Sequence, residues 1–217
     1  MSKNKVTKLT VGPLATNCWI YPINNDDAVI IDPGDEADKI IFTLKKLDIA
    51  PKFILLTHGH FDHICAVPEL SVLKPKIAIH SLDSGNLGPE SYQIHRKSLE
   101  SVFGDSSFLD AYWNEMPPAD ILLEEGSVIG PFTVFHLPGH SPGSAAFYDK
   151  EQKILFTGDT LFKNGYGRTD LIEGNEGQLF ASLKRLFALD PDVAVYPGHG
   201  GTTTIGQEAA RYSSYPP

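Results

Sequence analysis

The segment 57–63 concentrates side chains that bind metal ions. It reads THGHFDH, so three histidines and one aspartate follow the pattern H-x-H-x-D-H within six residues. In an extended chain the side chains of residues i and i+2 point the same way, so His58 and His60 would converge where a strand ends. This density of nitrogen and oxygen ligands suits zinc, iron or manganese, and the lack of thiolates in the run argues against a structural cysteine site. The segment therefore predicts a metal site.

Three further candidate ligands lie downstream, each in a turn marked by glycine. They are His140 in LPGHSPG, Asp159 in FTGDT and His199 in YPGHG, and each follows a strand-like run. Glycine allows the backbone to come close to a metal ion at such turns. We expect these loops to contribute to the metal centre that begins with segment 57–63.

The elements that must position these residues alternate between strands and helices. We expect short strands at residues 5–12, 18–23, 28–32, 53–57, 76–80, 133–137, 145–149, 153–157 and 193–196. We expect helices at residues 36–47, 64–73, 91–103, 178–189 and 205–212. The pattern predicts one α/β domain over residues 1–217, because a chain of this length can bury a single core.

Composition excludes several classes of protein. The chain has 18 Lys and Arg against 27 Asp and Glu, which leaves little basic surface for a nucleic-acid backbone. No apolar run approaches the roughly 18 residues of a membrane span, and the N-terminal residues lack the apolar core of a signal peptide. We expect a cytoplasmic protein with a small-molecule substrate, no nucleic-acid partner and no membrane partner. Cys18 and Cys65 are expected to stay reduced.

The motifs HxHxDH, PGHSPG, GD and PGH, in this order, resemble the metallo-β-lactamase superfamily over roughly residues 11–208. The resemblance implies an α/β fold, a four-layer αββα sandwich with its metals at one edge. It also implies two divalent metal ions per chain, zinc in the first place and iron or manganese as alternatives. The implied ligands are His58, His60 and His140 for one ion, Asp62, His63 and His199 for the other, and Asp159 as a bridge between them.

Such a centre would hydrolyse its substrate with water rather than with a protein nucleophile. Coordination lowers the pKa of water from about 15.7 to about 7, and two metals can hold the hydroxide between them and polarise a carbonyl. Asp62 is the carboxylate that we expect to orient the hydroxide or handle its proton, while it also serves as a ligand. Cys65 is expected to be turned away by a helix. We expect His80, His95 and His136 to be structural.

Residues 156–162 and 165–170, FTGDTLF and GYGRTD, resemble the glyoxalase II branch, which hydrolyses glutathione thioesters. The leading interpretation is a metal-dependent hydrolase of S-lactoylglutathione or a related hydroxyacyl thioester. Arg168 could grip a substrate carboxylate, or it could tie down its own loop through Asp170. Asp170 and Gly201 stand where the family has tyrosines that touch glutathione, and the chain ends before the family's C-terminal helical region. It therefore resembles the short glyoxalase II-like hydrolases.

A second interpretation comes from the related persulfide dioxygenases, which share the Gly-Arg-Thr-Asp run. Those enzymes oxidise glutathione persulfide with a single iron, which His58, His140 and Asp159 would hold here. Lactonases, β-lactamases and RNA-processing nucleases are further members of the superfamily. The acidic charge disfavours a nuclease, and the full set of ligands disfavours a role without catalysis.

The least regular stretch, residues 81–118, is longer than a strand connection needs. It contains the aromatic residues Tyr92, Phe103, Phe108, Tyr112 and Trp113. Long loops that persist in a compact domain are often functional. We expect this segment to lie over or beside the metals as a substrate-pocket insertion that shapes an acyl pocket. The alternative is an interaction surface for a homo-oligomer.

Overall fold

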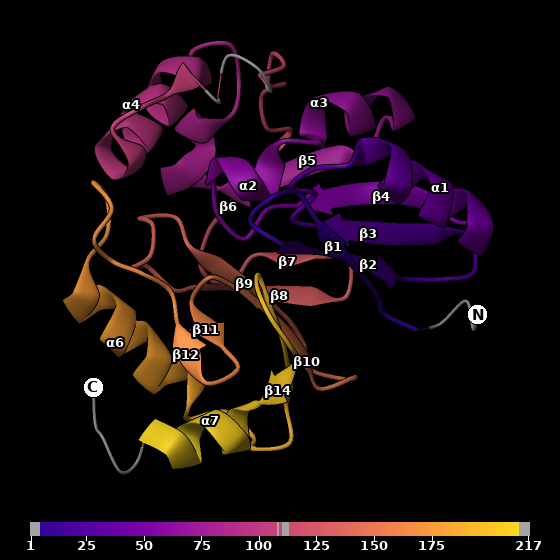
Figure 1. Ribbon diagram of the computed structural model, residues 1–217. Helices are drawn as coiled ribbons and strands as arrows, with labels where there is room; N and C mark the ends of the chain where they lie inside the picture. Colours follow the sequence, from indigo (N-terminus) through magenta and orange to yellow (C-terminus); the bar gives the residue numbers. More distant parts are fainter. Residues whose placement is uncertain (1–4, 108, 110–112, 213–217) are drawn as a thin grey trace.

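The computed structural model of the protein describes residues 5–107, 109 and 113–212. Two six-stranded sheets pack face to face, and helices cover the outer face of each (Figure 1). The expected four-layer αββα sandwich is therefore confirmed. Among the described residues, no helix has the length and apolar character that crossing a membrane would require.

The first sheet has the strand order β1-β2-β3-β4-β5-β6. Its strands are β1 (Thr7–Val11), β2 (Thr16–Pro22), β3 (Asp27–Ile31), β4 (Ala50–Leu55), β5 (Lys76–His80) and β6 (Ile121–Leu123). The pairs from β1 to β3 are antiparallel, whereas those from β3 to β6 are parallel. Because parallel strands end at the same edge of a sheet, the loops after β3, β4 and β5 gather at one edge.

The second sheet has the order β14-β13-β10-β9-β8-β7. Its strands are β7 (Val128–Ile129), β8 (Phe132–His136), β9 (Ala145–Asp149), β10 (Ile154–Gly158), β13 (Ala194–Pro197) and β14 (Thr203–Thr204). Strands β8 and β10 run in the same direction because both are antiparallel to β9, and β13 is parallel to β10. The loops after β8, β10 and β13 therefore also share one edge. A small hairpin, β11 (Leu161–Phe162) and β12 (Gly165–Tyr166), follows β10.

The helices lie on the outer faces. Those of the first half are α1 (Ala37–Leu47), α2 (Phe61–Ile64), α3 (Val67–Leu70) and α4 (Ser91–Phe103), with the 3₁₀ turns η1 (Ser71–Leu73) and η2 (Ser81–Asn86). Those of the second half are α6 (Glu176–Leu186) and α7 (Ile205–Tyr212). In α6 the residues Leu179, Leu183 and Leu186 recur at helical spacing and are buried against the second sheet.

Three buried clusters match the spaces between the four layers. The aromatic cluster between the sheets includes Phe132, Phe147 and Phe156. A second cluster packs α1, α2 and α3 on the first sheet, and a third packs α6 on the second sheet. The two sheets meet at their shared edge, where the backbone N–H of Asn17 donates to the carbonyl of Gly198 at 2.7 Å.

The expected helix at residues 64–73 is wrong in its continuity. The chain forms α2, α3 and η1 instead, and Pro68 stands in the first turn of α3. Proline lacks the N–H that a continuous helix would use but is well suited to the start of a new one. Helix α2 begins at Phe61, so Asp62 and His63 lie in its single turn. Cys18 and Cys65 are not joined in a disulfide, as expected.

Candidate metal centre

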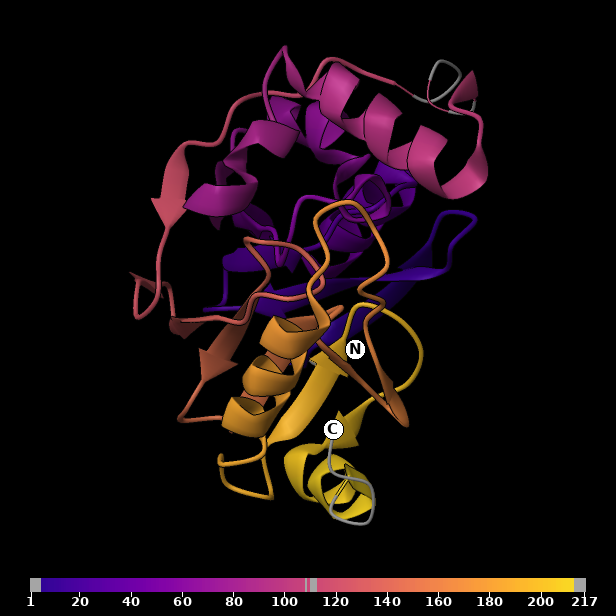
Figure 2. The same cartoon turned by 90° about the vertical axis from the view of Figure 1, so that its left-hand side faces the viewer.

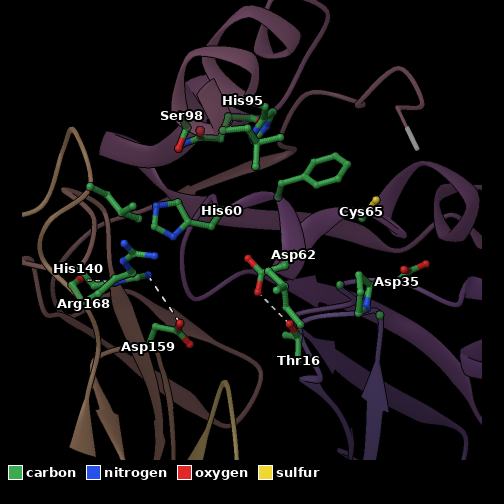
Figure 3. Close-up of a pocket in the computed structure, with 18 of the residues that line it drawn as sticks. Thr16, Asp35, His60, Asp62, Cys65, His95, Ser98, His140, Asp159 and Arg168 are labelled. Atoms are coloured by element: carbon green, nitrogen blue, oxygen red, sulfur yellow. Dashed lines mark hydrogen bonds and ion pairs between the residues drawn. The ribbon is translucent and has the colours of Figure 1, made fainter. Parts of the chain in front are cut away.

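The edge at which both sheets end collects the predicted ligands. The loop after β4 carries His58 and His60 and leads into α2, while the β8–β9 loop carries His140. Asp159 follows β10 directly, and His199 follows β13. Figure 3 shows His60, Asp62, His140 and Asp159 pointing toward a common centre. Segments that are far apart in the sequence thus meet at one place, as the motifs predict.

The first cluster is the three-histidine group, His58, His60 and His140, whose ligand atoms all lie within 4.8 Å of one another. The Nε2 atoms of His58 and His140 are 3.2 Å apart. The Nδ1 of His140 donates to the carbonyl oxygen of Arg168 at 2.8 Å, so its Nε2 is left with a lone pair for a cation. The Nδ1 of His58 lies 3.1 Å from the Thr57 hydroxyl.

The second cluster is the mixed group, Asp62, His63 and His199, whose ligand atoms also lie within 4.8 Å of one another. Asp159 lies between the two groups. Its Oδ2 is 3.7 Å from His140 Nε2 and 3.4 Å from His199 Nε2, and its Oδ1 is 3.4 Å from His63 Nε2. This is the position that a bridging carboxylate requires.

Two buried atoms at this centre test whether the residues fit a metal ion. Among the described residues, His63 Nε2 and Asp159 Oδ1 are buried without a hydrogen-bond partner. Buried polar atoms without partners are unfavourable, and each deserves an explanation such as an ion. Histidine nitrogens and carboxylate oxygens are ligands that a divalent cation accepts. The residues present therefore fit a centre of two metal ions.

Asp32, at the end of β3, supports the mixed group from behind. Its Oδ1 accepts from the Thr57 N–H at 2.8 Å, and its Oδ2 accepts from the Thr57 hydroxyl at 2.7 Å and from His63 Nδ1 at 3.0 Å. Asp32 also falls within 4.8 Å of His58 and His63 ligand atoms, but its oxygens are already used by these donors. We assign it to the orientation of His63, a role that sequence reasoning missed.

The two groups differ in charge. Burial lowers the pKa of His60 to about 3, aided by the nearby His140, and burial also lowers the pKa of His58 well below its usual value. Burial opposes the charge of His63 too, but the carboxylates of Asp62, Asp159 and Asp32 outweigh it and raise the pKa of His63 to about 9.

The remaining members of the mixed group follow the same logic. Burial acts against the charged form of His199, yet its contacts with Asp159 and Asp62 raise its pKa to about 10. Burial likewise opposes ionisation of Asp62, but His63 and His199 hold its pKa below the usual range of an aspartate. Without metal the mixed group is a set of charged partners, whereas His58 and His60 are neutral.

A cavity of about 950 Å³ opens above this centre. Its floor includes His60, Asp62, His140, Asp159 and His199. Its walls come from the β1–β2 turn, from α4 and from the loop between β12 and α6, which extends toward α4 (Figure 2). Described residues of segment 81–118 that line it are Asn86, Ile94, His95, Lys97, Ser98, Leu99 and Asp105. Phe108 and Tyr112 lie outside the described residues.

Trp113 packs behind this wall of the cavity and supports it. Its ring stacks on Phe61, with centroids 6.3 Å apart and an interplanar angle of 16°, and it packs against Tyr92 and His95. It lines a separate hollow of about 370 Å³ rather than the larger cavity. The Nε2 of His95 is bonded to the carbonyl of Asn86 at 2.9 Å, which is a structural contact.

Arg168 lines the cavity but is engaged by its own loop. Its Nε and Nη2 donate to the two carboxylate oxygens of Asp170 at 2.7 and 2.8 Å. Both side chains are exposed. In this structure Arg168 therefore makes the loop contact with Asp170 that the sequence allowed as one alternative. The same loop holds His140 through the Arg168 carbonyl.

The other candidate residues take no place among the ligands. Cys65 lies at the cavity wall apart from the histidines (Figure 3), and burial raises the pKa of its thiol to about 12. His80 and His136 stack on each other with centroids 4.0 Å apart, and His136 Nε2 contacts the Pro142 carbonyl at 2.8 Å.

The chain resembles known proteins over nearly its whole length. The sequence model of the Metallo-beta-lactamase superfamily matches residues 11–199. Hydroxyacylglutathione hydrolase GloC from Haemophilus influenzae is 38% identical over 203 residues, which cover 88% of this chain and 89% of the relative.

Two solved structures add to this likeness. The crystal structure of TTHA1623 in a di-iron-bound form has a TM-score of 0.81 at 40% identity, and the match covers 94% of this chain and 97% of that one. The crystal structure of BLEG-1 B3 metallo-beta-lactamase has a TM-score of 0.83 at 35% identity, with 98% of each chain covered. Together with the fold and the two clusters of ligands, these matches place the chain in the metallo-beta-lactamase superfamily of metallo-hydrolases, in its glyoxalase II-like branch.

Proposed function

We propose that the protein hydrolyses a thioester at a centre of two metal ions, with S-lactoylglutathione or a related hydroxyacyl thioester as substrate. The observation that carries this proposal is the convergence of two complete ligand groups, joined by Asp159, on the floor of one cavity. Its similarity to a hydroxyacylglutathione hydrolase, at 38% identity, supports the choice of thioester.

The proposed ligands are those of the two groups. They are His58, His60, His140, Asp62, His63, His199 and Asp159. Zinc is the proposed metal, and iron or manganese are the alternatives that suit the same nitrogen and oxygen donors. Two ions bound there would lower the pKa of a water molecule to about 7 and polarise the substrate carbonyl.

Asp62 is the proposed catalytic carboxylate. It lines the cavity, and its Oδ2 accepts a hydrogen bond from the Thr16 hydroxyl at 2.9 Å. The same oxygen lies 3.5 Å from His63 Nε2 and 3.4 Å from His199 Nε2. Thr16 fixes the carboxylate so that it can orient the attacking water and hold the proton that the water gives up. The thiolate of the substrate is then the leaving group.

The cavity walls are proposed to hold the rest of the substrate. Lys97 of α4 and Arg168 are exposed cations on the walls, and both could meet carboxylates of a glutathione-like thiol once Arg168 exchanges Asp170 for the substrate. Leu14, Ile94 and Ile172 are exposed apolar side chains on the same walls and can cover the acyl group. In this proposal α4 shapes the acyl pocket. The alternative for segment 81–118, a surface for self-association, predicts that α4 variants change oligomeric state instead of kinetics.

The direct test is a metal count by mass spectrometry combined with assays of thiol release from S-lactoylglutathione. We expect two ions per chain and thiol release in the parent protein. We expect His140→Ala to lose thiol release and to bind fewer than two ions. Two ions without thiol release from this or other hydroxyacyl thioesters would contradict the substrate. A single iron with oxygen uptake on glutathione persulfide would establish the dioxygenase alternative, in which His58, His140 and Asp159 hold the iron.

A further inference from the structure

The turn η2, which follows β5, packs between the two loops that carry the three-histidine group. The carboxylate of Asp83 in this turn accepts hydrogen bonds from Gly59 N at 3.0 Å, from the Ser141 hydroxyl at 2.7 Å and from Gly143 N at 2.6 Å. Asp83 is 1% exposed. We propose that Asp83 is a positioning residue that joins these loops so that His58, His60 and His140 converge on one metal ion. The inference rests on the proposed metal centre.

The hydrogen bonds of Asp83 reach both loops at residues next to the histidines of the group. Gly59 lies between the first two histidines of the group, so a bond to its N–H fixes the peptide that separates His58 from His60. Ser141 follows His140 directly, and Gly143 completes the same turn. One carboxylate therefore connects two segments that are more than 80 residues apart. Such supporting partners set the orientation of metal-binding histidines.

The packing of η2 explains two glycines of the metal-binding motifs. A Cβ at position 143 would lie 2.6 Å from Asp83 Cγ, and a Cβ at position 59 would lie 2.5 Å from Asn86 Cβ. Any side chain at either position would push η2 away. Both loops thus approach this turn as closely as their backbones allow, which gives the Asp83 carboxylate its short bonds.

Charge links Asp83 to the same group. Asp83 takes part in none of the ion pairs found among the described residues. The three groups that donate hydrogen bonds to it are neutral. A buried carboxylate is unfavourable unless hydrogen bonds and an opposite charge compensate it. A cation bound by the neighbouring three-histidine group would supply that charge. Asp83 therefore favours the metal-loaded form of the three-histidine group.

Asp32 provides the contrast, because it bonds directly to His63 of the mixed group and reaches His58 only through Thr57. Each proposed ion then has its own buried carboxylate, Asp83 for the three-histidine group and Asp32 for the mixed group. Their removal should weaken different ions. A purely structural role for Asp83 would lower the stability of the whole domain and would select neither ion.

The experiment measures binding of Co²⁺ to the metal-free protein by visible absorption, in competition with a chelator. Asp83→Asn keeps the shape of the side chain, but its amide points an N–H toward a donor. We expect one of the two ions to bind about 10- to 100-fold more weakly. His140→Ala and His199→Ala provide reference spectra in which one ligand of each group is missing. With one ion bound, the spectrum of Asp83→Asn should match the spectrum of His140→Ala. With one ion bound, the spectrum of Asp32→Asn should match the spectrum of His199→Ala.

Asp149→Asn is the matched control, because Asp149 is a buried carboxylate that accepts from Tyr21 Oη at 2.6 Å and Gln152 N at 3.0 Å, both outside the metal centre. It should bind both ions as the parent protein does. If Asp83→Asn binds both ions normally, weakens both equally, or behaves like the Asp149 variant, the inference is wrong. If it does not fold, Ser141→Ala removes one of the three bonds and should weaken the same ion a few-fold.

The readout separates this inference from the proposed function. Selective loss of one ion in Asp83→Asn, together with no thioester hydrolysis by the parent protein, would leave Asp83 in its role and reject the substrate. If instead the parent protein hydrolyses the thioester with two ions bound, and Asp83→Asn binds both ions normally, the proposed function stands and the role of Asp83 is rejected. If the parent protein binds a single ion, the two-ion proposal fails, and Asp83→Asn must still weaken that ion more than Asp149→Asn does.

Discussion

The candidate ligands carry unequal numbers of protons before any metal binds. His63 and His199 have pKa values raised to about 9 and about 10, so both are protonated at pH 7, whereas His60, with a pKa of about 3, is not. A metal must displace protons from the mixed group but not from His60. Affinity of the mixed group should therefore rise as pH increases toward about 9 to 10 and fall as pH decreases.

Calorimetry of metal binding at pH 7, in buffers of different ionisation enthalpy, measures the protons released. We expect about two protons for the ion in the mixed group and a smaller release for the ion in the three-histidine group. His199→Ala should lower the total by about one proton. Equal release from both groups would contradict this assignment of charge.

Thr16 contributes through a single hydroxyl group. Thr16→Val keeps the shape of the side chain but removes the donor to Asp62 Oδ2 at 2.9 Å. A hydrogen bond to a charged group contributes about 1.5 kcal/mol or more, so kcat for the thioester should fall roughly tenfold while two metal ions remain bound. Steady-state kinetics with a metal count check this result. Thr43→Val, which removes an exposed hydroxyl bonded to the Lys39 carbonyl, should leave kcat unchanged.

Arg168 can serve a substrate only if it exchanges Asp170 for a substrate carboxylate. The pair is exposed, and exposed ion pairs contribute about 0 to 1 kcal/mol, so this exchange is inexpensive. Arg168→Ala should raise KM for a glutathione thioester about fivefold and leave KM for an uncharged thioester unchanged. Asp170→Ala should not raise KM for either substrate. An equal rise in KM for both substrates in Arg168→Ala would assign Arg168 to the loop alone.

At the scale of secondary-structure elements, some helices stabilise the fold without contributing to the metal centre. Helix α6 packs on the second sheet through Leu179, Leu183 and Leu186 and does not supply a ligand. Leu183→Ala should lower the free energy of unfolding by about 2 to 5 kcal/mol, because it leaves a cavity in a closed cluster. Urea unfolding measures this change, and metal content of the folded protein should be unaffected. Lys184→Ala, on the exposed face, is the control.

Periodicity in the sequence predicts the longer elements well. Strand β5, strand β9 and helix α4 have the bounds that the pattern indicates. The two-residue strands β7, β11, β12 and β14 were not predicted, since two residues carry no periodic signal. The helix expected at residues 64–73 divides at Pro68 because proline begins a helix more readily than it continues one.

The convergence of the candidate metal ligands could be predicted because they lie in short motifs with distinctive spacing. The residues that support them could not. Asp32 reaches His63 over 31 positions, and Asp83 reaches Ser141 over 58 positions, so neither belongs to a local pattern. Their partners become visible only when β3, β5 and the β8–β9 loop are brought to one edge. Arg168 was predicted as a substrate contact or a loop contact, and its bidentate bond to Asp170 is what the structure contains.

At the scale of the whole molecule, the metal centre joins the two halves of the sandwich. The three-histidine group takes His58 and His60 from the first half and His140 from the second. The mixed group takes Asp62 and His63 from the first half and His199 from the second. Direct contacts at this joint include the pairing of Thr16 with His199 and the Trp19 Nε1 bond to the Pro197 carbonyl at 3.1 Å.

Removal of metal should therefore loosen the joint as well as stop catalysis. Ligands that bind only the folded state stabilise it by mass action, about 2.7 kcal/mol at a concentration 100 times the Kd. Chelation should lower the melting temperature by several degrees, and added metal should restore it. The double variant His140→Ala with His199→Ala should melt at the same temperature with and without chelator.

The Thr16–His199 pairing has a consequence for how the protein responds to its surroundings. Because the sheets touch at the same edge where both ions would bind, the cohesion of the two halves along this edge would depend in part on the metal supply. In a cell short of metal, the population would shift toward chains whose halves separate more easily, and such chains are better substrates for proteases. Abundance of this protein would then rise and fall with the metal available to it.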